Sequence, residues 1–196
     1  MMATRYLADR DAVPILRVAL KDPVDEVRLL AYSLLSSKER VIDQILDALR
    51  QAQEQMQAAG NEAELGRIEE QVATLNLEKA ELGLVEGSVR QFVLKQALEH
   101  ITAALRERIT GSREFIHGRI CLRIALADGE RDQIDAAEHA FAAAEQYGMG
   151  ADKVAPYRAE CAFERGAYEL VPAQLQRIEP QTRTIPRLAP VVEYWT

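Results

Sequence analysis

The chain has 196 residues, of which 48% are hydrophobic and 28% are charged, and its formal net charge is −7. An acidic chain without a basic stripe is a poor candidate for nucleic-acid binding, because phosphate contacts supply most of that affinity. The same charge argues against direct adsorption to anionic membranes. Gly and Pro are scarce, and strong helix formers fill long stretches without alternating β-branched runs. We therefore predict an all-α fold.

The chain carries no pattern typical of secretion. Its two cysteines, Cys121 and Cys161, lie in helical patterns and favour a reducing compartment over a disulfide framework. No signal peptide is visible. The longest apolar run, "LLAYSLL", is far shorter than the roughly 20 residues that a membrane helix needs, so we expect no direct membrane insertion by this chain.

Residues 1–36 are predicted to form a helical hairpin. Apolar residues spaced three and four apart predict a helix over 11–20. "KDP" follows, with Asp22 as a good N-cap and Pro23 as a good first residue of the second helix. An apolar stripe then continues through Val27, Leu30, Ala31, Leu34 and Leu35.

Residues 37–86 are predicted to form an antiparallel coiled-coil hairpin. A new helix is expected from Ser36, and Gly60 and Asn61 form the predicted turn, with Asn61 as N-cap. Steps of three and four residues mark a heptad seam on either side of the turn. The seam residues are Ile42, Ile45, Leu49, Ala52, Met56 and Ala59, then Leu65, Ile68, Val72, Leu75, Lys79 and Leu82. A heptad hairpin can also pair between chains, which leaves a homo-oligomer open.

Residues 87–180 are predicted to form further helical pairs, and 181–196 an extended Pro-rich tail. The first helix has a wide apolar face, formed by Val89, Phe92, Val93, Leu98, Ile101 and Leu105. Helices over 112–127 and 134–147, separated by the loop "DGERDQ", and a last pair over 155–178 broken near Gly166 should follow. A spacing of roughly 30–40 residues per pair is typical of helical solenoids.

Two repeat families are similar to parts of the chain. "DAVPILRVALKDPVDEVRLLAYSLL" resembles a HEAT repeat through Asp22-Pro23, Val27-Arg28 and Ala31. The resemblance implies that the Asp-Pro pair sets the turn and that Arg28 bridges neighbouring units. The second half resembles tetratricopeptide repeats. The matching positions are Gly118, Ala137, Phe141 and Ala144, then Ala159, Gly166 and Tyr168. The long loop "DGERDQ" and Pro172 near the start of the last helix depart from that pattern.

The order of these segments resembles the cytosolic region of the PelE family. "DPVDEVRLLAYSLL" and "GLVEGSVRQFVLKQALEHITAAL" carry most of the resemblance. It implies a part in the Pel exopolysaccharide biosynthesis system of Gram-negative bacteria. The expected partners are the Pel glycosyltransferase and the inner-membrane Pel components. The expected location is the cytoplasm, as the cytosolic region of an inner-membrane protein whose membrane segment lies upstream.

Five residues are candidate partner contacts. In the tetratricopeptide alignment, Phe115, Arg119, Leu122 and Arg123 fall where first helices line the concave groove of a solenoid. Arg can hold a carboxylate in a fork and Phe can supply an apolar anchor. The alternative is that the Arg side chains lie over the next repeat. Trp195, the single tryptophan, either caps the last repeat or docks on another chain, and capping is favoured.

Catalytic patterns are weak. His117 and Cys121 have the spacing of a metal-chelating pair on a helix, but no second pair of ligands is evident. His100 and His139 each follow a glutamate, whereas HEAT-type di-iron oxygenases use repeated His-Glu pairs. We find no Gly-rich phosphate loop, no G-x-S-x-G and no Cys-x-x-Cys. The sequence therefore predicts a non-catalytic protein-protein scaffold without cofactor or metal. The alternatives are a generic tetratricopeptide adaptor for peptides and, less favoured, a HEAT-like metalloenzyme or lyase.

Overall fold

The computed structural model describes residues 9–184 and 188–195, and all regular elements in these ranges are helices. The all-α prediction is confirmed. Contacts divide the chain into two compact units, Met1–Ala97 and Leu98–Thr196. We describe each unit by itself.

The first unit begins with a helical hairpin. Helix α1 (Asp9–Ala19) and helix α2 (Asp25–Ala59) pack together, and Ala12, Val13 and Leu16 of α1 are buried. The second helix begins two residues later than predicted. The Asp22 side chain accepts a hydrogen bond from the Val24 N–H at 2.9 Å, and this local turn holds 22–24 outside the helix.

Arg28 stabilises the turn of its own hairpin. Its Nη1 donates to the Asp22 carbonyl at 2.8 Å and to the Pro23 carbonyl at 3.2 Å, and its Nη2 pairs with Asp25. The HEAT resemblance implied that this arginine bridges neighbouring units. In the structure its bonding partners are residues of the turn itself.

Helix α2 runs through Ser36 without a break, so the predicted new helix at that residue is wrong. Ser36 and Ser37 can cap a helix, but neither Gly nor Pro stands here to end the preceding one. A continuous ladder of backbone hydrogen bonds is therefore retained. The second helix of the first hairpin and the first arm of the next hairpin are one helix of 35 residues.

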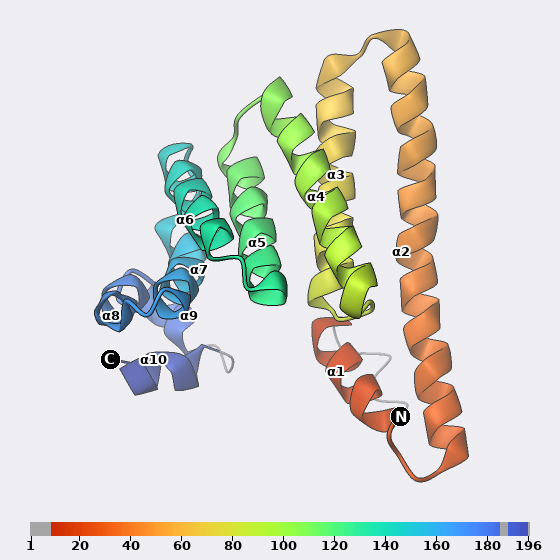
Figure 1. Cartoon of the computed structure of the whole chain (residues 1–196), viewed down its shortest axis with the longest axis horizontal. Helices are drawn as coiled ribbons and strands as arrows, with labels where there is room; N and C mark the ends of the chain where they lie inside the picture. The colour runs from red at the N-terminus through yellow and green to blue at the C-terminus, as the bar shows by residue number, and fades with distance from the viewer. Residues whose placement is uncertain (1–8, 185–187, 196) are drawn as a thin grey trace. The chain divides into compact units, whose positions relative to one another are not determined.

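Helix α3 (Glu62–Glu81) returns antiparallel to α2, as predicted (Figure 1). Gly60 ends α2 with φ 66°, and the Asn61 side chain accepts from the Glu64 N–H at 3.2 Å. Lys79 Nζ lies 2.7 Å from Asp43 Oδ1, and Gln53 Nε2 lies 2.7 Å from Glu69 Oε1. From the first pair to the second, the residue number rises by ten on α2 and falls by ten on α3. The two pairs therefore define the antiparallel register of the helices.

The predicted seam is buried unevenly. On α3, Ile68 and Val72 are buried, and Lys79 is only 8% exposed. On α2, Ile42 is buried, whereas Ile45 remains exposed. Helix α3 alone covers only one side of the longer helix α2. Ile45 therefore lies at the edge of the α2–α3 contact rather than inside it.

Lys79 predicts a pH-dependent stability of the α2–α3 hairpin. Burial lowers the pKa of Lys79, but hydrogen bonds and attraction from Asp43 and Glu39 outweigh burial and raise it above its ordinary 10.5. This stabilisation is therefore present below pH 10.5 and is lost as the pH rises through the raised folded-state value. We expect the difference in unfolding free energy between the native chain and Lys79→Met to shrink above pH 10.5, as measured by urea titration. A difference that stays constant from pH 8 to 12 would contradict this assignment.

Helix α4 (Gly87–Glu107) buries a narrower face than predicted. Val93, Leu94, Ala97, Ile101 and Ala104 share one side of the helix and are buried. Val89 and Phe92 are 52% and 63% exposed, which corrects their assignment to the buried face. Phe92 points almost opposite to the buried stripe on a helix of 3.6 residues per turn.

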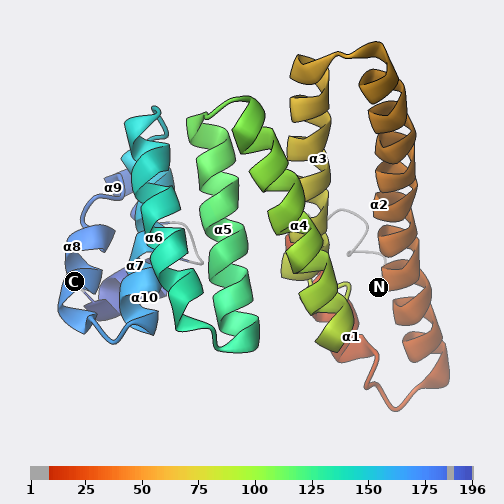
Figure 2. The ribbon, with the colours of Figure 1, turned by 45° about the horizontal axis from the view of Figure 1, so that its top comes forward.

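The second unit packs consecutive helices against one another (Figure 2). They are α5 (Gly111–Asp128), α6 (Arg131–Gln146), α7 (Ala151–Glu164), the 3-10 helix η2 (Tyr168–Leu170) and α8 (Val171–Leu175). The link between α5 and α6 is only Gly129 and Glu130, shorter than the predicted loop. Gly129 takes φ 71°, and its N–H bonds to the Ala125 carbonyl, so the turn is complete within two residues.

Gly118 sets the distance between α5 and α6. A Cβ placed on Gly118 would lie 2.6 Å from Cε1 of Phe141, whose ring is fully buried. Ala137 and Ala144, one turn to either side of Phe141, are buried in the same cluster. The small residue on α5 and the aromatic residue on α6 therefore interlock.

The C-terminal segment is helical where it is described, so the predicted extended tail is wrong. Helices α9 (Pro180–Arg183) and α10 (Ala189–Trp195) occupy it. Pro180 lies in the first turn of α9 and Pro190 in that of α10, where a proline has no N–H to lose from the helix ladder. Residue 186, the third proline of this segment, lies outside the described residues.

Candidate functional site

The candidate surface lies on α5 and α7, two helices of the second unit that are in contact. Residues four apart on α5 share one side of the helix, which places Phe115, Arg119 and Arg123 in a row. Tyr157 and Glu160 of α7 meet this row. We call these five residues the α5–α7 surface.

At the centre of the α5–α7 surface, an arginine lies over two aromatic rings. Phe115 and Tyr157 pack edge to face with centroids 5.2 Å apart, and each ring is within 6.0 Å of the buried Phe141. The Arg119 guanidinium carbon is 5.7 Å from the centroids of both Phe115 and Tyr157. This geometry is that of a cation–π contact. Because the rings are half-buried against the core, their packing fixes the place of the arginine.

Arg123 is engaged within the chain. Its Nη1 and Nη2 donate to the two carboxylate oxygens of Glu160 at 2.9 and 3.0 Å. This fork geometry is strong and directional. Arg123 thus joins α5 to α7 through Glu160.

Leu122 lies in the core rather than on the surface. Its side chain is fully buried in a cluster with Phe141 and Val154. Helices α6 and α7 both pack on α5, and together they cover it. Leu122 is therefore removed from the set of partner contacts.

Tyr157 and Glu160 were not predicted from the sequence. Glu160 follows its partner Arg123 by 37 residues. That separation lies within the spacing of one helical pair, so matching each α5 position to the next pair could have found it. Tyr157 carries no local signal, because an aromatic residue on a helix is most often core.

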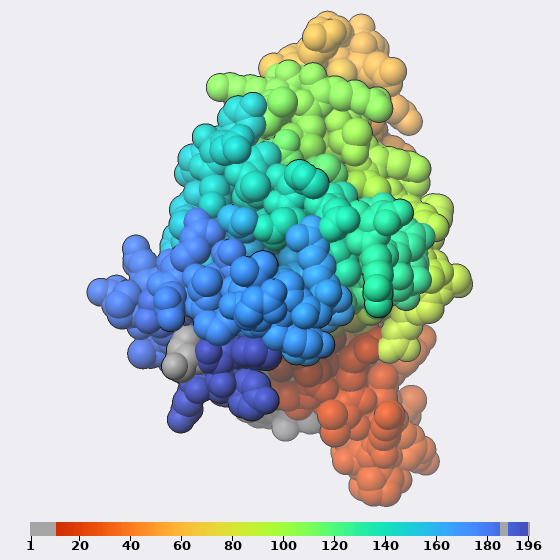
Figure 3. All heavy atoms as spheres, turned by 60° about the vertical axis from the view of Figure 1, so that its left-hand side comes forward, coloured from red at the N-terminus to blue at the C-terminus, as the bar shows by residue number. Residues whose placement is uncertain are grey.

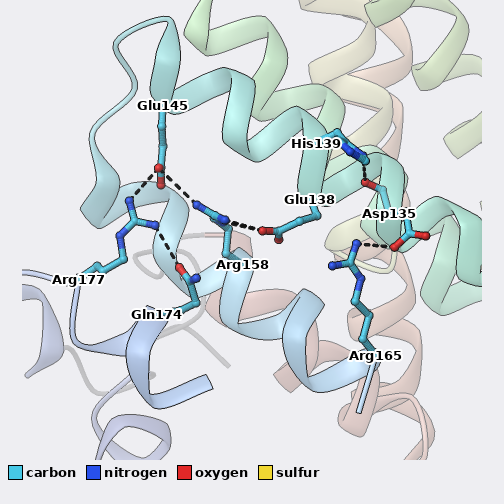
Figure 4. A network of polar contacts seen from close by, with 8 residues as sticks. All are labelled: Asp135, Glu138, His139, Glu145, Arg158, Arg165, Gln174 and Arg177. Atoms are coloured by element: carbon cyan, nitrogen blue, oxygen red, sulfur yellow. Dashed lines mark hydrogen bonds and ion pairs between the residues drawn. The ribbon is translucent and has the colours of Figure 1, made fainter. Parts of the chain in front are cut away.

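A second polar network fixes the rotation of α7 from its other side (Figure 4). Arg158 donates to Glu138 from Nη2 at 2.6 Å and from Nε at 2.8 Å, and its Nη1 lies 3.4 Å from Glu145. Glu145 also accepts from Arg177 at 2.7 Å. Since Arg158 is adjacent to Tyr157, this network holds Tyr157 and Glu160 toward α5.

The candidate metal ligands do not converge. Cys121 is buried in the core of the second unit, and burial raises the pKa of its thiol to about 12. His117 Nδ1 is 3.4 Å from Glu114, one turn back on α5. Glu138, which precedes His139, is paired with Arg158. Residues 9–184 and 188–195 contain no group of three or more His, Cys, Asp or Glu that could hold a metal ion.

Trp195 packs against the last helices of its own unit. It lies against a buried cluster that includes Ala159, Val171 and Leu175, with ring centroids 6.2 Å from Phe163 and from Tyr168. Figure 3 shows α10, in dark blue, against the blue atoms of this region. The C-terminal helix therefore lies on helices of its own chain.

Comparisons with known proteins give no relative. No protein-family model matches the chain, and no curated protein or solved structure does. None of the helices in the described part of the chain is long and apolar enough to cross a bilayer.

Proposed function

We propose that this chain is a non-catalytic scaffold that holds a partner protein on the α5–α7 surface. The observation that carries the proposal is the Arg119 guanidinium, held over the Phe115 and Tyr157 rings. Arginine and aromatic residues dominate the binding energy of many interfaces. A prepositioned anchor of this kind binds with little loss of side-chain freedom.

The packing of α5 and α6 supports a tetratricopeptide-like array. The interlocked Gly118 and Phe141, with Ala137 and Ala144 buried beside them, occupy the positions that the resemblance assigned. The first hairpin and the α2–α3 hairpin precede this array in the order that resembles the PelE family. On this basis we propose a HEAT-like hairpin, a coiled-coil hairpin and tetratricopeptide-like pairs in one helical-hairpin solenoid.

The resemblance also supplies the proposed partner. We take it to be the glycosyltransferase of a Pel exopolysaccharide synthase, assembled with the inner-membrane Pel components at the cytoplasmic face of the inner membrane. The chemistry of the anchor suits a partner loop that brings a carboxylate to Arg119 and an apolar side chain to the aromatic rings. Arg123 contributes only where a partner carboxylate displaces Glu160.

Co-purification with that glycosyltransferase tests the proposal. We expect the native chain to retain the enzyme and Arg119→Glu to lose most of it, because a carboxylate over the rings repels the partner's own. Arg131→Glu is the matched control, since it makes the same charge change at an exposed position at the start of α6.

Two results would contradict the proposal. If the native chain retains no enzyme, the scaffold assignment fails for this partner. If Arg119→Glu and Arg131→Glu bind equally well, the α5–α7 surface is not the binding site. A short acidic peptide that binds the native chain and not Arg119→Glu would instead favour the generic adaptor.

A further inference from the structure

Helix α2 has a second apolar stripe that α3 does not cover. Its residues step by four, seven, four, three and four positions, which keeps them on one narrow side of a helix. They are Leu30, Leu34, Val41, Ile45, Ala48 and Ala52. Leu30, Val41 and Ile45 are 43%, 53% and 43% exposed. A stripe of this regularity is unusual on a solvated face, where apolar residues are scattered singly.

The stripe borders an open groove between α2 and α3. Ile45 and Leu49 line it from α2, and Leu75 lines it from α3. Its α3 rim carries Arg67, Glu70, Gln71 and Thr74. The groove is therefore apolar at its floor and polar at its rim, as in sites that accept the apolar face of a helix.

Length and spacing limit what can fill the site. From Leu30 to Ala52 the stripe extends about 33 Å at 1.5 Å per residue. An occupant must be a straight, preformed helix of similar length with apolar residues three and four apart. Helix α2 of a second copy meets both requirements, because it has 35 residues and carries the same stripe.

The charge distribution also favours a second copy. The chain has a net charge of −7, so two copies repel one another unless they meet through a neutral face. The outer border of the stripe is formed mostly by uncharged residues, Ser33, Ser37, Gln44, Gln51 and Gln55, and the charged residues beside the stripe are Lys38 and Arg40. Charged residues of the same stretch, Asp47, Arg50 and Glu54, lie toward the opposite side of α2. The rim residues Arg67 and Glu70 add one charge of each sign.

We propose that two copies of this chain associate through these stripes, each α2 lying in the α2–α3 groove of the other. A two-fold axis makes the contact self-complementary and joins two hairpins into a four-helix bundle. The proposal rests on the first unit alone and does not depend on the proposed function.

Light scattering coupled to size-exclusion chromatography, over a dilution series of the full chain, tests it. We expect a mass twice the 21.9 kDa of one chain at high concentration, which falls toward one chain on dilution. The double variant Val41→Glu/Ile45→Glu should raise the dissociation constant about tenfold or more. Both positions are exposed helix sites, so far-UV circular dichroism should retain the native helix content.

Leu29→Glu/Tyr32→Glu is the matched control. Both residues are apolar and more exposed than those of the stripe, but they lie on another side of α2. This control should associate like the native chain. The dilution series should span about a 100-fold range of concentration. If the native chain has the mass of one copy throughout that range, the proposal is overturned. Equal dissociation constants for the two double variants would also overturn it.

Discussion

Gly118→Ala should destabilise the second unit by about 1–2 kcal/mol, although alanine is the better helix former. The added methyl group would lie 2.6 Å from Cε1 and 2.7 Å from Cδ1 of Phe141. That ring is fully buried and also packs on Phe115 and Tyr157, so it has no space to move into. The strain exceeds the gain in helix propensity. Thermal or urea unfolding measures the loss, and Gly118→Leu should prevent native packing of the unit.

A compensating substitution separates the contact from a general effect. Phe141→Leu removes ring atoms from the position that the new methyl group needs. In the pair Gly118→Ala/Phe141→Leu, the loss should fall short of the sum of the single losses by about 1 kcal/mol. Strict additivity, or a Gly118→Ala variant more stable than the native chain, would show that α5 and α6 are not in close contact here.

Arg113→Ala should cost about 3 kcal/mol of unfolding free energy. Arg113 is only 4% exposed, and its Nη1 donates to the Ala104 and Arg108 carbonyls at 2.6 and 2.8 Å. The same nitrogen lies 2.6 Å from Oε2 of Glu107. Removing the guanidinium leaves carbonyl groups at the end of α4 and a half-buried carboxylate without this donor. Urea unfolding of the purified chain measures the loss.

Two further variants define the cause. Arg106→Ala, at an exposed position on α4, should change stability by no more than about 0.5 kcal/mol. Arg113→Lys keeps the charge but not the planar guanidinium, so its loss should fall between those of the two alanine variants. Equal losses for Arg113→Ala and Arg106→Ala would contradict a role for Arg113 in closing the end of α4.

Helix positions in this chain follow from local signals, and the errors occur where those signals compete. Gly60 and Asn61 mark the α2–α3 turn correctly because one requires a left-handed conformation and the other caps a helix. Asp22 and Ser36 are good capping residues too. Asp22 uses its side chain in a turn, and Ser36 stands where nothing ends the preceding helix. Capping chemistry permits a helix start but does not enforce one.

The tail shows the same limit for proline. Several prolines in a short segment favour an extended chain, yet Pro180 and Pro190 lie in the first turns of short helices. Burial decides between an extended and a helical tail. As a helix, α10 places Val192 and Trp195 on the apolar cluster formed by α7 and α8. Local sequence does not contain that information, because the covered residues lie on α7 and α8.

The candidate surface could be predicted on one helix only. Helical spacing and the repeat alignment place Phe115, Arg119 and Arg123 in one row, and the structure has them so. The spacing shows which residues share one side of α5, but it does not show which other helix packs against that side. It therefore missed Tyr157 and Glu160, and it could not separate the buried Leu122 from its half-buried neighbours.

Sedimentation velocity of this chain mixed with the cytosolic Pel glycosyltransferase tests the scaffold assignment most directly. The account predicts a saturable complex of fixed stoichiometry with the native chain, and no such complex with Arg119→Glu. Two separate boundaries at every mixing ratio, from proteins that are each folded, would contradict it.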